Sequence, residues 1–197
     1  YANICLDAEN MGFNFPDTNF GMLKNINLKI NPGEKIIIDG ENGSGKTTLI
    51  RVLSGLLHHT SGSLYINDNT FNKIDVKQYR ARIGSIIQGE TTFEGTILEN
   101  ITFNDKNISS EDLKWALDAV QLTSYIKKLP KGLDTKIFPE GKELSSSNIQ
   151  KILLARSIIH KPTILFYEEP TDKMDTKVAN EIIDFITSET NKWTVVV

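Results

Sequence analysis

The sequence predicts an α/β fold, because two apolar strand patterns are each followed by a helical pattern. Residues 35–39 read Lys-Ile-Ile-Ile-Asp, a short strand, and after a glycine-rich loop the apolar residues between 49 and 57 recur at helical spacing. A second apolar run at residues 163–167 precedes a helical pattern at residues 178–186, with isoleucines on its inner face.

Strand patterns dominate the first thirty residues and recur as far as Gln88. Apolar residues are spread over residues 4–15, a turn signal follows at 16–19, and the residues from Ile26 to Ile30 alternate strictly. Residues 63–67 and 83–87 read as further short strands, and a short helical segment precedes the second of them. We expect the N-terminal part of the chain to be rich in β-strands.

The character of the sequence changes to helix near residue 97. Ser110 is expected to cap a helix, and apolar spacing then continues to Leu129. We expect a single domain, in which residues 95–158 form a helical subdomain and residues 1–94 and 159–197 form the core with its β subdomain.

Length and composition limit the classes of protein to which the chain can belong. With 197 residues and 39% hydrophobic content, the chain can bury a substantial core, and a net charge of −3 gives no basic footprint for a nucleic-acid partner. Cys5 is the only cysteine, which excludes an internal disulfide and a thiolate metal cluster. No apolar run approaches the roughly 18 residues of a membrane span, so we expect a soluble fragment. Its start without Met and its end in an apolar run suggest a piece of a longer protein.

The loop between residues 39 and 49 predicts phosphate binding. It carries Gly40, four residues, Gly45, Lys46 and the hydroxyl of Thr47, directly after a strand and before a helix. In this pattern backbone N–H groups surround the phosphates of a nucleotide, the lysine reaches the β/γ oxygens, and the hydroxyl can ligate Mg²⁺. Glycines allow the positive φ angles and the close approach that such a loop needs.

Three later segments narrow the choice among kinases, GTPases and motor ATPases. Gln88 followed by residues 93–101, then Leu144–Gln150, then Ile164–Thr171 resemble, together with the loop, the nucleotide-binding domain of ATP-binding cassette (ABC) transporters. Residues 93–101 resemble the exporter type, whose cassette is fused behind a transmembrane domain. The resemblance covers nearly the whole chain. It implies a P-loop NTPase core, an N-terminal antiparallel β subdomain and a helical signature-motif subdomain.

The resemblance also implies roles for single residues, with ATP and Mg²⁺ as cofactors. Glu169 is implied as the catalytic carboxylate that polarises the attacking water, and Gln88 is implied to contact that water and the metal. Thr47, Gln88 and Glu168 are the implied metal residues. The residues implied to bind the nucleotide are Phe15, Gly40, Glu41, Asn42, Gly43, Ser44, Gly45, Lys46, Thr47, Thr48, Ser145, Ser147, Asn148 and Asp175.

Three of these residues have a structural alternative. Gln88 could instead be a polar residue at the edge of a strand. Phe15 stands where the family stacks an aromatic ring on adenine, and it could instead be a core strand residue. Asp175 stands in the loop that crosses the dimer interface in the family, and it could equally cap the following helix. The switch histidine of the family is expected beyond Val197. His58, His59 and His160 do not match its position, and we expect them at the surface.

Two departures from the family pattern bear on activity. Glu168 replaces the usual aspartate, and its extra methylene shifts a carboxylate toward a metal that tolerates misplacement poorly. Residues 144–148 read Leu-Ser-Ser-Ser-Asn instead of Leu-Ser-Gly-Gly-Gln, the motif that in the family binds the γ-phosphate held by the opposite subunit. Side chains in place of both glycines weaken this half-site. The alternative is that these serines merely cap a helix.

The implied function is ATP binding and hydrolysis in a head-to-tail dimer that powers export across a membrane. The partners are then a second nucleotide-binding domain, identical or different, and a transmembrane domain of the same polypeptide, at the cytoplasmic face of a membrane. Because Glu169 is present beside an altered signature, a different partner subunit is one hypothesis. The alternative functions are a degenerate regulatory module that binds ATP without turnover, and a soluble cassette ATPase.

Overall fold

The computed structural model describes residues 3–16, 21–138 and 143–197. The chain separates into two compact units, each described here by itself. The first unit comprises Tyr1–Ile87, Thr163–Glu168 and Lys192–Val197, and the second comprises Gln88–Pro162 and Glu169–Asn191. Among the described residues, no helix has the length and apolar character that crossing a bilayer requires.

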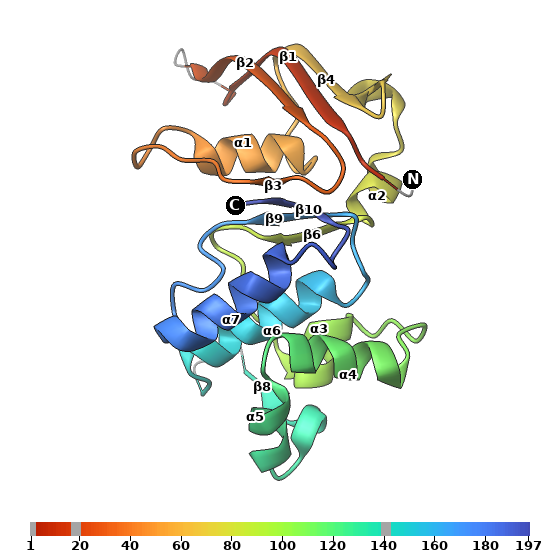
Figure 1. The fold of residues 1–197 in the computed structure, drawn as a ribbon, viewed down its shortest axis with the longest axis vertical. Coiled ribbons are helices and arrows are strands. Elements are labelled where there is room, and N and C mark those ends of the chain that lie inside the picture. The colour runs from red at the N-terminus through yellow and green to blue at the C-terminus, as the bar shows by residue number, and fades with distance from the viewer. Residues whose placement is uncertain (1–2, 17–20, 139–142) are drawn as a thin grey trace. The chain divides into compact units, whose positions relative to one another are not determined.

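A four-stranded parallel sheet forms the base of the first unit (Figure 1). Its order is β3 (Lys35–Ile36), β10 (Thr194–Val196), β9 (Ile164–Tyr167) and β6 (Ile83–Ile86). All four residues of β9 are buried, as its apolar run predicts. The strand predicted at 35–39 is shorter in the structure because Ile37 leaves the sheet and is 82% exposed, although Ile38 N still donates to Val197 O at 2.6 Å.

An antiparallel sheet forms the other layer of the first unit and confirms the predicted β part. Its order is β2 (Gly21–Ile30), β1 (Leu6–Asn14), β4 (Ser61–Ile66) and β5 (Asn69–Thr70). The predicted turn at 16–19 falls largely on residues 17–20, which lie outside the described residues.

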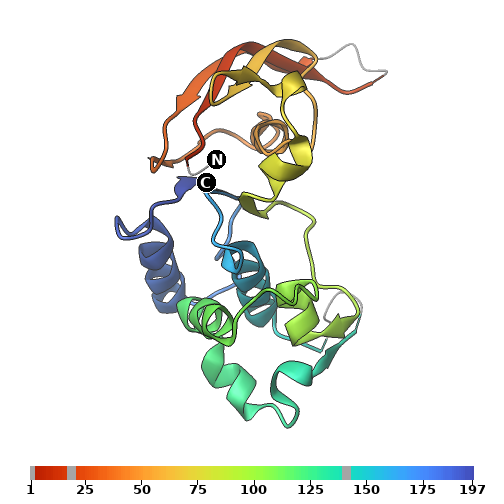
Figure 2. The same ribbon diagram turned by 90° about the vertical axis from the view of Figure 1, so that its right-hand side faces the viewer.

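Helix α1 (Lys46–Leu53) lies between the two sheets of this unit, as Figures 1 and 2 show. Its Ile50, Val52 and Leu53 are at most 2% exposed and join a core to which both sheets contribute. The short helices η1 (Phe71–Lys73) and α2 (Val76–Arg80) close one side of that core. The burial of α1 therefore fixes the loop that precedes it.

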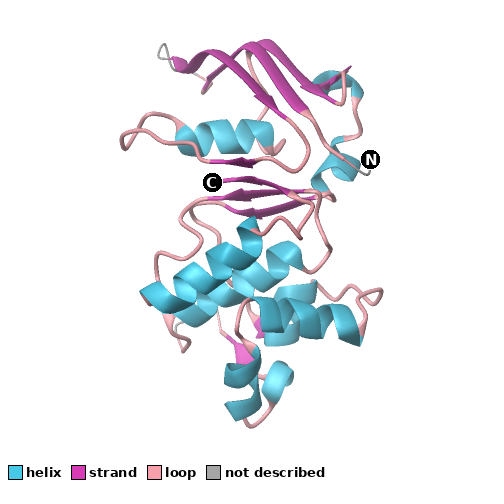
Figure 3. Ribbon diagram, viewed as in Figure 1, coloured by secondary structure: helices cyan, strands magenta, loops and turns pink. Residues whose placement is uncertain are grey.

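The second unit is mostly helical (Figure 3). Its helices are α3 (Ile97–Thr102), α4 (Ser110–Ala119), α5 (Thr123–Lys128), η2 (Gly132–Asp134), α6 (Ser146–Ile158) and α7 (Thr176–Thr187). One antiparallel pair, β7 (Gly95–Thr96) with β8 (Lys136–Ile137), was not predicted, because two-residue strands are too short to show alternation.

The start of α4 differs by one residue from the prediction. Ser109, not Ser110, caps the helix: Ser109 has the extended backbone of a cap residue, and its Oγ accepts a hydrogen bond from Asp112 N at 3.0 Å. Ser110 already has helical conformation, so its side chain is not placed to cap the N-terminus.

Helix α6 forms the centre of the second unit. Seven of its residues are buried, among them Ile152, Leu154 and Ala155, each 0% exposed. Arg156 ties it to α3, since its Nε donates to Asn100 O at 2.7 Å. Burial lowers the pKa of Arg156, and the nearby Glu90 opposes that shift. The C-terminal turn of α6 is thereby tied to α3.

Candidate nucleotide-binding site

The glycine-rich loop joins β3 to α1 at the surface of the first unit. Residues 39–44 are exposed, and Gly45 stands at the N-cap of α1 with φ 98°. A Cβ at Gly45 would lie 3.0 Å from Leu23 Cδ2 and 3.2 Å from Met22 O, so both the conformation and the space require glycine. The loop therefore presents its backbone at the N-terminus of an eight-residue helix, an arrangement that favours anions.

Lys46 turns back over this loop. Its Nζ donates to Gly40 O and, at 2.9 Å, to Glu41 O. The ammonium group is thus held beside the same backbone that would surround a phosphate. A cation in this position can exchange a carbonyl oxygen for a phosphate oxygen with little movement of the main chain.

Thr47 connects the loop to the end of β9. Its Oγ1 donates a hydrogen bond to Glu168 Oε1, and Glu168 N donates to Ile86 O at 2.8 Å. A hydroxyl and a carboxylate side by side are oxygen ligands of the kind that Mg²⁺ prefers, so these two residues fit the metal. The structure brings together two of the three predicted metal residues. Gln88, the third, belongs to the second unit.

Phe15 follows the end of β1 and is 37% exposed. Its ring meets that of Phe13 edge to face, with centroids 4.9 Å apart. Phe13 is the buried member of the pair, at 5% exposure. Phe15 keeps an accessible part of its ring, and its stacking on adenine stays a prediction.

The predicted water-handling residues are the first residues of the two segments that make up the second unit. Gln88 and Glu169 are both exposed. Glu169 has φ 46°, a left-handed conformation that is uncommon for a residue with a side chain. Such conformations persist where surrounding contacts hold them, and they gather at functional sites.

The altered signature forms the start of α6. Ser145 caps this helix, with its Oγ accepting from Asn148 N at 3.2 Å, and Ser146 begins the first turn. Likewise Asp175 caps α7, with Oδ1 accepting from Val178 N at 3.1 Å. Ser145 and Asp175 therefore both act as helix caps, as the structural alternatives predict. Contacts of Ser145, Ser147, Asn148 and Asp175 with a nucleotide stay predictions.

Sequence reasoning gave no role to Gln150, which the structure places against the loop of Glu169. Its side chain contacts three residues of this loop, Glu169, Asp172 and Lys173. Gln150 is 9% exposed, but it stands beside Lys151 in a polar part of the sequence, so no sequence signal separates it from a surface residue. Beside it, Lys173 Nζ pairs with Asp172 Oδ2, and this hydrogen bond and charge raise the pKa of Lys173.

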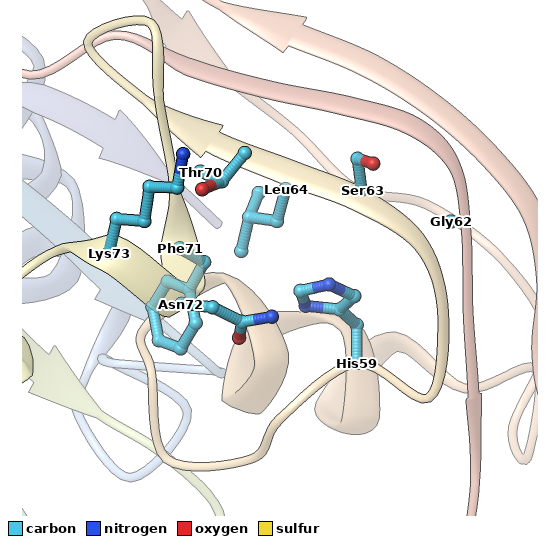
Figure 4. Close-up of a pocket in the computed structure, with 8 residues that line it drawn as sticks. All are labelled: His59, Gly62, Ser63, Leu64, Thr70, Phe71, Asn72 and Lys73. Carbon is cyan, nitrogen blue, oxygen red and sulfur yellow. The ribbon is translucent and has the colours of Figure 1, made fainter.

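A separate hollow of about 240 Å³ opens in the first unit (Figure 4). Its lining consists of His59, Gly62, Ser63, Leu64, Thr70, Phe71, Asn72 and Lys73. None of these is a predicted site residue. His59 corrects one expectation: it is half-buried, whereas His58 and His160 are exposed as expected. Burial, and after it the neighbouring His58, lower the pKa of the His59 imidazole.

The fold and the site together define a class. A parallel sheet, a glycine-rich loop at a helix N-terminus and a carboxylate after a nearby strand are the parts of a P-loop nucleotide-binding domain. The structure resembles that of a bacterial Atm1-family ABC exporter with ATP bound, with a TM-score of 0.90 at 24% identity, over 98% of this chain and 34% of the other. This likeness shows the fold.

Comparison of sequences then shows the family. The ABC transporter family matches residues 23–172, and the chain belongs to it. Heavy metal tolerance factor 1 of Caenorhabditis elegans is 34% identical, over 90% of this chain and 22% of that protein. The ABC transporter ATP-binding protein YfiB of Bacillus subtilis is 32% identical, over 93% of this chain and 32% of that protein. The probable microcin-H47 secretion/processing ATP-binding protein MchF of Escherichia coli is 31% identical, over 88% of this chain and 25% of that protein.

Proposed function

We propose that this chain binds MgATP, closes head to tail with a second nucleotide-binding domain around two nucleotides, and hydrolyses them to power export by a membrane transporter. The contact between Thr47 of the phosphate-binding loop and Glu168 at the end of β9 carries the proposal, because a hydroxyl and a carboxylate side by side are the kind of oxygen ligands that Mg²⁺ prefers. Membership of the ABC transporter family supports the transport role.

Each residue then has a task. The loop amides and Lys46 hold the phosphates, and Phe15 holds the adenine. Thr47, Glu168 and Gln88 would hold Mg²⁺, which neutralises phosphate charge when bound. Glu169 accepts the proton of the attacking water. The longer side chain of Glu168 leads us to expect weaker metal binding than an aspartate gives.

The larger assembly is likewise a proposal. The chain spans about a third or less of the length of the relatives named above, so a transmembrane domain of the same polypeptide is proposed as its partner. The domain would then work at the cytoplasmic face of a membrane. Residues 95–158 would form the helical subdomain that carries the signature.

The altered signature suggests a partner of a different kind. Ser146 and Ser147 stand in the first turn of α6, where the family has glycines that let a phosphate approach the backbone. We propose a heteromeric exporter in which this chain keeps its own Glu169, while the partner supplies an unaltered signature to its nucleotide. Purification of the full-length protein as an active homodimer with two equivalent sites would contradict this.

Steady-state phosphate release by the full-length protein in lipid tests the function. We expect turnover that Glu169→Gln reduces by about a hundredfold or more, because the substitution removes the proton acceptor and keeps its shape. Turnover that is unchanged by Glu169→Gln would overturn the catalytic assignment. ATP binding with no turnover in either protein, with the partner subunit present, would overturn the proposed hydrolysis.

A further inference from the structure

The side chain of Gln150 holds the loop that carries Glu169. Gln150 lies in the second turn of α6 and is 9% exposed. Its Nε2 donates to Glu169 O at 3.1 Å and also to Asp172 Oδ1, while its Oε1 accepts from Lys173 N at 2.9 Å. One amide group therefore uses both of its N–H donors and its carbonyl on three residues of one loop.

This loop needs such support because of its conformation. Glu169 has φ 46°, and two further backbone bonds, from Asp172 N to Glu169 O and from Met174 N to Thr171 O, fold the chain back on itself. The direction of a residue's carbonyl relative to its Cα–Cβ bond is set by the torsion ψ. A group that fixes the Glu169 carbonyl therefore also restricts the direction in which the Glu169 side chain leaves the backbone.

We propose that Gln150 is a positioning residue for Glu169: it holds the left-handed backbone from which the carboxylate reaches the attacking water. This inference rests on the proposed function of Glu169. The same side chain connects the helix that begins with the altered signature to the loop of the glutamate, because Gln150 follows Ser145 by five residues in α6. A small displacement of a catalytic group lowers rate more than it lowers substrate binding.

The site needs a side chain that both donates and accepts hydrogen bonds, as the amide of Gln150 does. Gln150→Glu keeps the length and the acceptor for Lys173 N, but it replaces the donor to Glu169 O and places a carboxylate beside Asp172. Gln150→Ala removes all three bonds. Lys151→Ala is the matched control, since Lys151 lies next in the same helix and its Nζ contacts Gln121 O at 3.4 Å, away from the loop.

The test measures kcat and KM for ATP, and the melting temperature, of the full-length transporter in lipid with each substitution. We expect Gln150→Ala and Gln150→Glu to lower kcat by about ten- to a hundredfold while KM for ATP stays within about twofold. Lys151→Ala should leave kcat within about twofold. In the Glu169→Gln background, adding Gln150→Ala should lower the residual turnover no further, because both changes remove the same action.

The outcomes separate positioning from stability. A kcat within twofold of wild type in Gln150→Glu would overturn the proposal, and so would an additive loss in the Glu169→Gln background. A loss in Gln150→Ala that is explained by a fall in melting temperature and in ATP binding would also overturn it, unless Gln150→Glu folds normally and still loses kcat. If Glu169→Gln itself keeps full turnover, the proposed function fails first, independently of Gln150.

Discussion

At the scale of single residues, Glu168 is the clearest departure from the family pattern in the proposed metal site. Its carboxylate accepts a hydrogen bond from the hydroxyl of Thr47, so the two groups proposed to hold the metal already lie within contact. The family position normally carries the shorter aspartate. The geometry of Mg²⁺ is strict, and one additional methylene is enough to place an oxygen poorly.

We predict that Glu168→Asp lowers the Mg²⁺ concentration at half-maximal ATP turnover, because the carboxylate then matches the length that the family uses. Glu168→Gln should raise that concentration by about tenfold or more, since it removes the charge that attracts the metal. Phosphate release by the full-length protein over a Mg²⁺ titration checks both. A higher Mg²⁺ requirement in Glu168→Asp would show that this site is adapted to glutamate.

At the scale of elements, helix caps account for several polar residues near the site. Asp175 caps α7, and the resemblance gives the same residue a place at a dimer interface. Asparagine caps a helix about as well as aspartate, so the two roles can be separated. We predict that Asp175→Ala destabilises the protein by about 1 kcal/mol, while Asp175→Asn leaves stability nearly unchanged.

Thermal unfolding and phosphate release of both Asp175 variants check this prediction. If Asp175 also acts across the dimer interface, Asp175→Asn lowers turnover at unchanged melting temperature. Normal turnover in Asp175→Asn would contradict a role at the dimer interface, and helix capping would then be the only role of Asp175.

The capping box of α3 predicts a pH dependence. Thr96 Oγ1 accepts from Glu99 N at 3.0 Å, and Glu99 Oε2 accepts from Thr96 N at 2.6 Å. The backbone hydrogen bond from Thr96, and after it the side-chain bond, hold the pKa of Glu99 below its usual 4.5. A lowered carboxyl pKa gives stability that is present above the unfolded pKa and is lost as the pH falls through the folded one.

We therefore expect the melting temperature of Glu99→Gln to lie below that of the unmodified protein at pH 7. The gap should shrink as the pH falls from about 4.5 through the lower pKa of the folded state, because below that pKa Glu99 is protonated in both states. Melting curves of the two proteins from pH 3 to pH 7 provide the comparison. A gap that stays constant over this range would contradict the role of the Glu99 charge.

The elements also show what sequence could predict. The buried strands and the amphipathic helices α1 and α7 follow from apolar spacing, and the glycine-rich loop follows from its spacing and context. The β7–β8 pair could not be predicted, because it joins two-residue strands forty residues apart. The role of Gln150 was missed for a similar reason: its three contacts lie 19 to 23 residues away in sequence, and only tertiary structure brings them together.

At the scale of the whole molecule, the altered signature bears on partner choice. Ser145 keeps the cap of α6, while Ser146 and Ser147 add side chains in the first turn. We predict that the double variant Ser146→Gly and Ser147→Gly raises turnover at the site that this signature completes. Glycine costs about 1 kcal/mol at each helical position, so a modest loss of thermal stability is expected with it.

Phosphate release by the assembled transporter tests that variant, with Lys151→Ala as a control in the same helix. Unchanged or lower turnover would show that this signature does not limit the reaction.

We propose that Glu169 accepts the proton of the water that attacks the nucleotide bound by residues 40–48. The most direct measurement is the identity of the nucleotide retained by the full-length protein and its Glu169→Gln variant after incubation with MgATP. We predict that the variant retains unhydrolysed ATP while the unmodified protein releases phosphate and holds ADP. ADP in both proteins, or no retained nucleotide in either, would contradict the account.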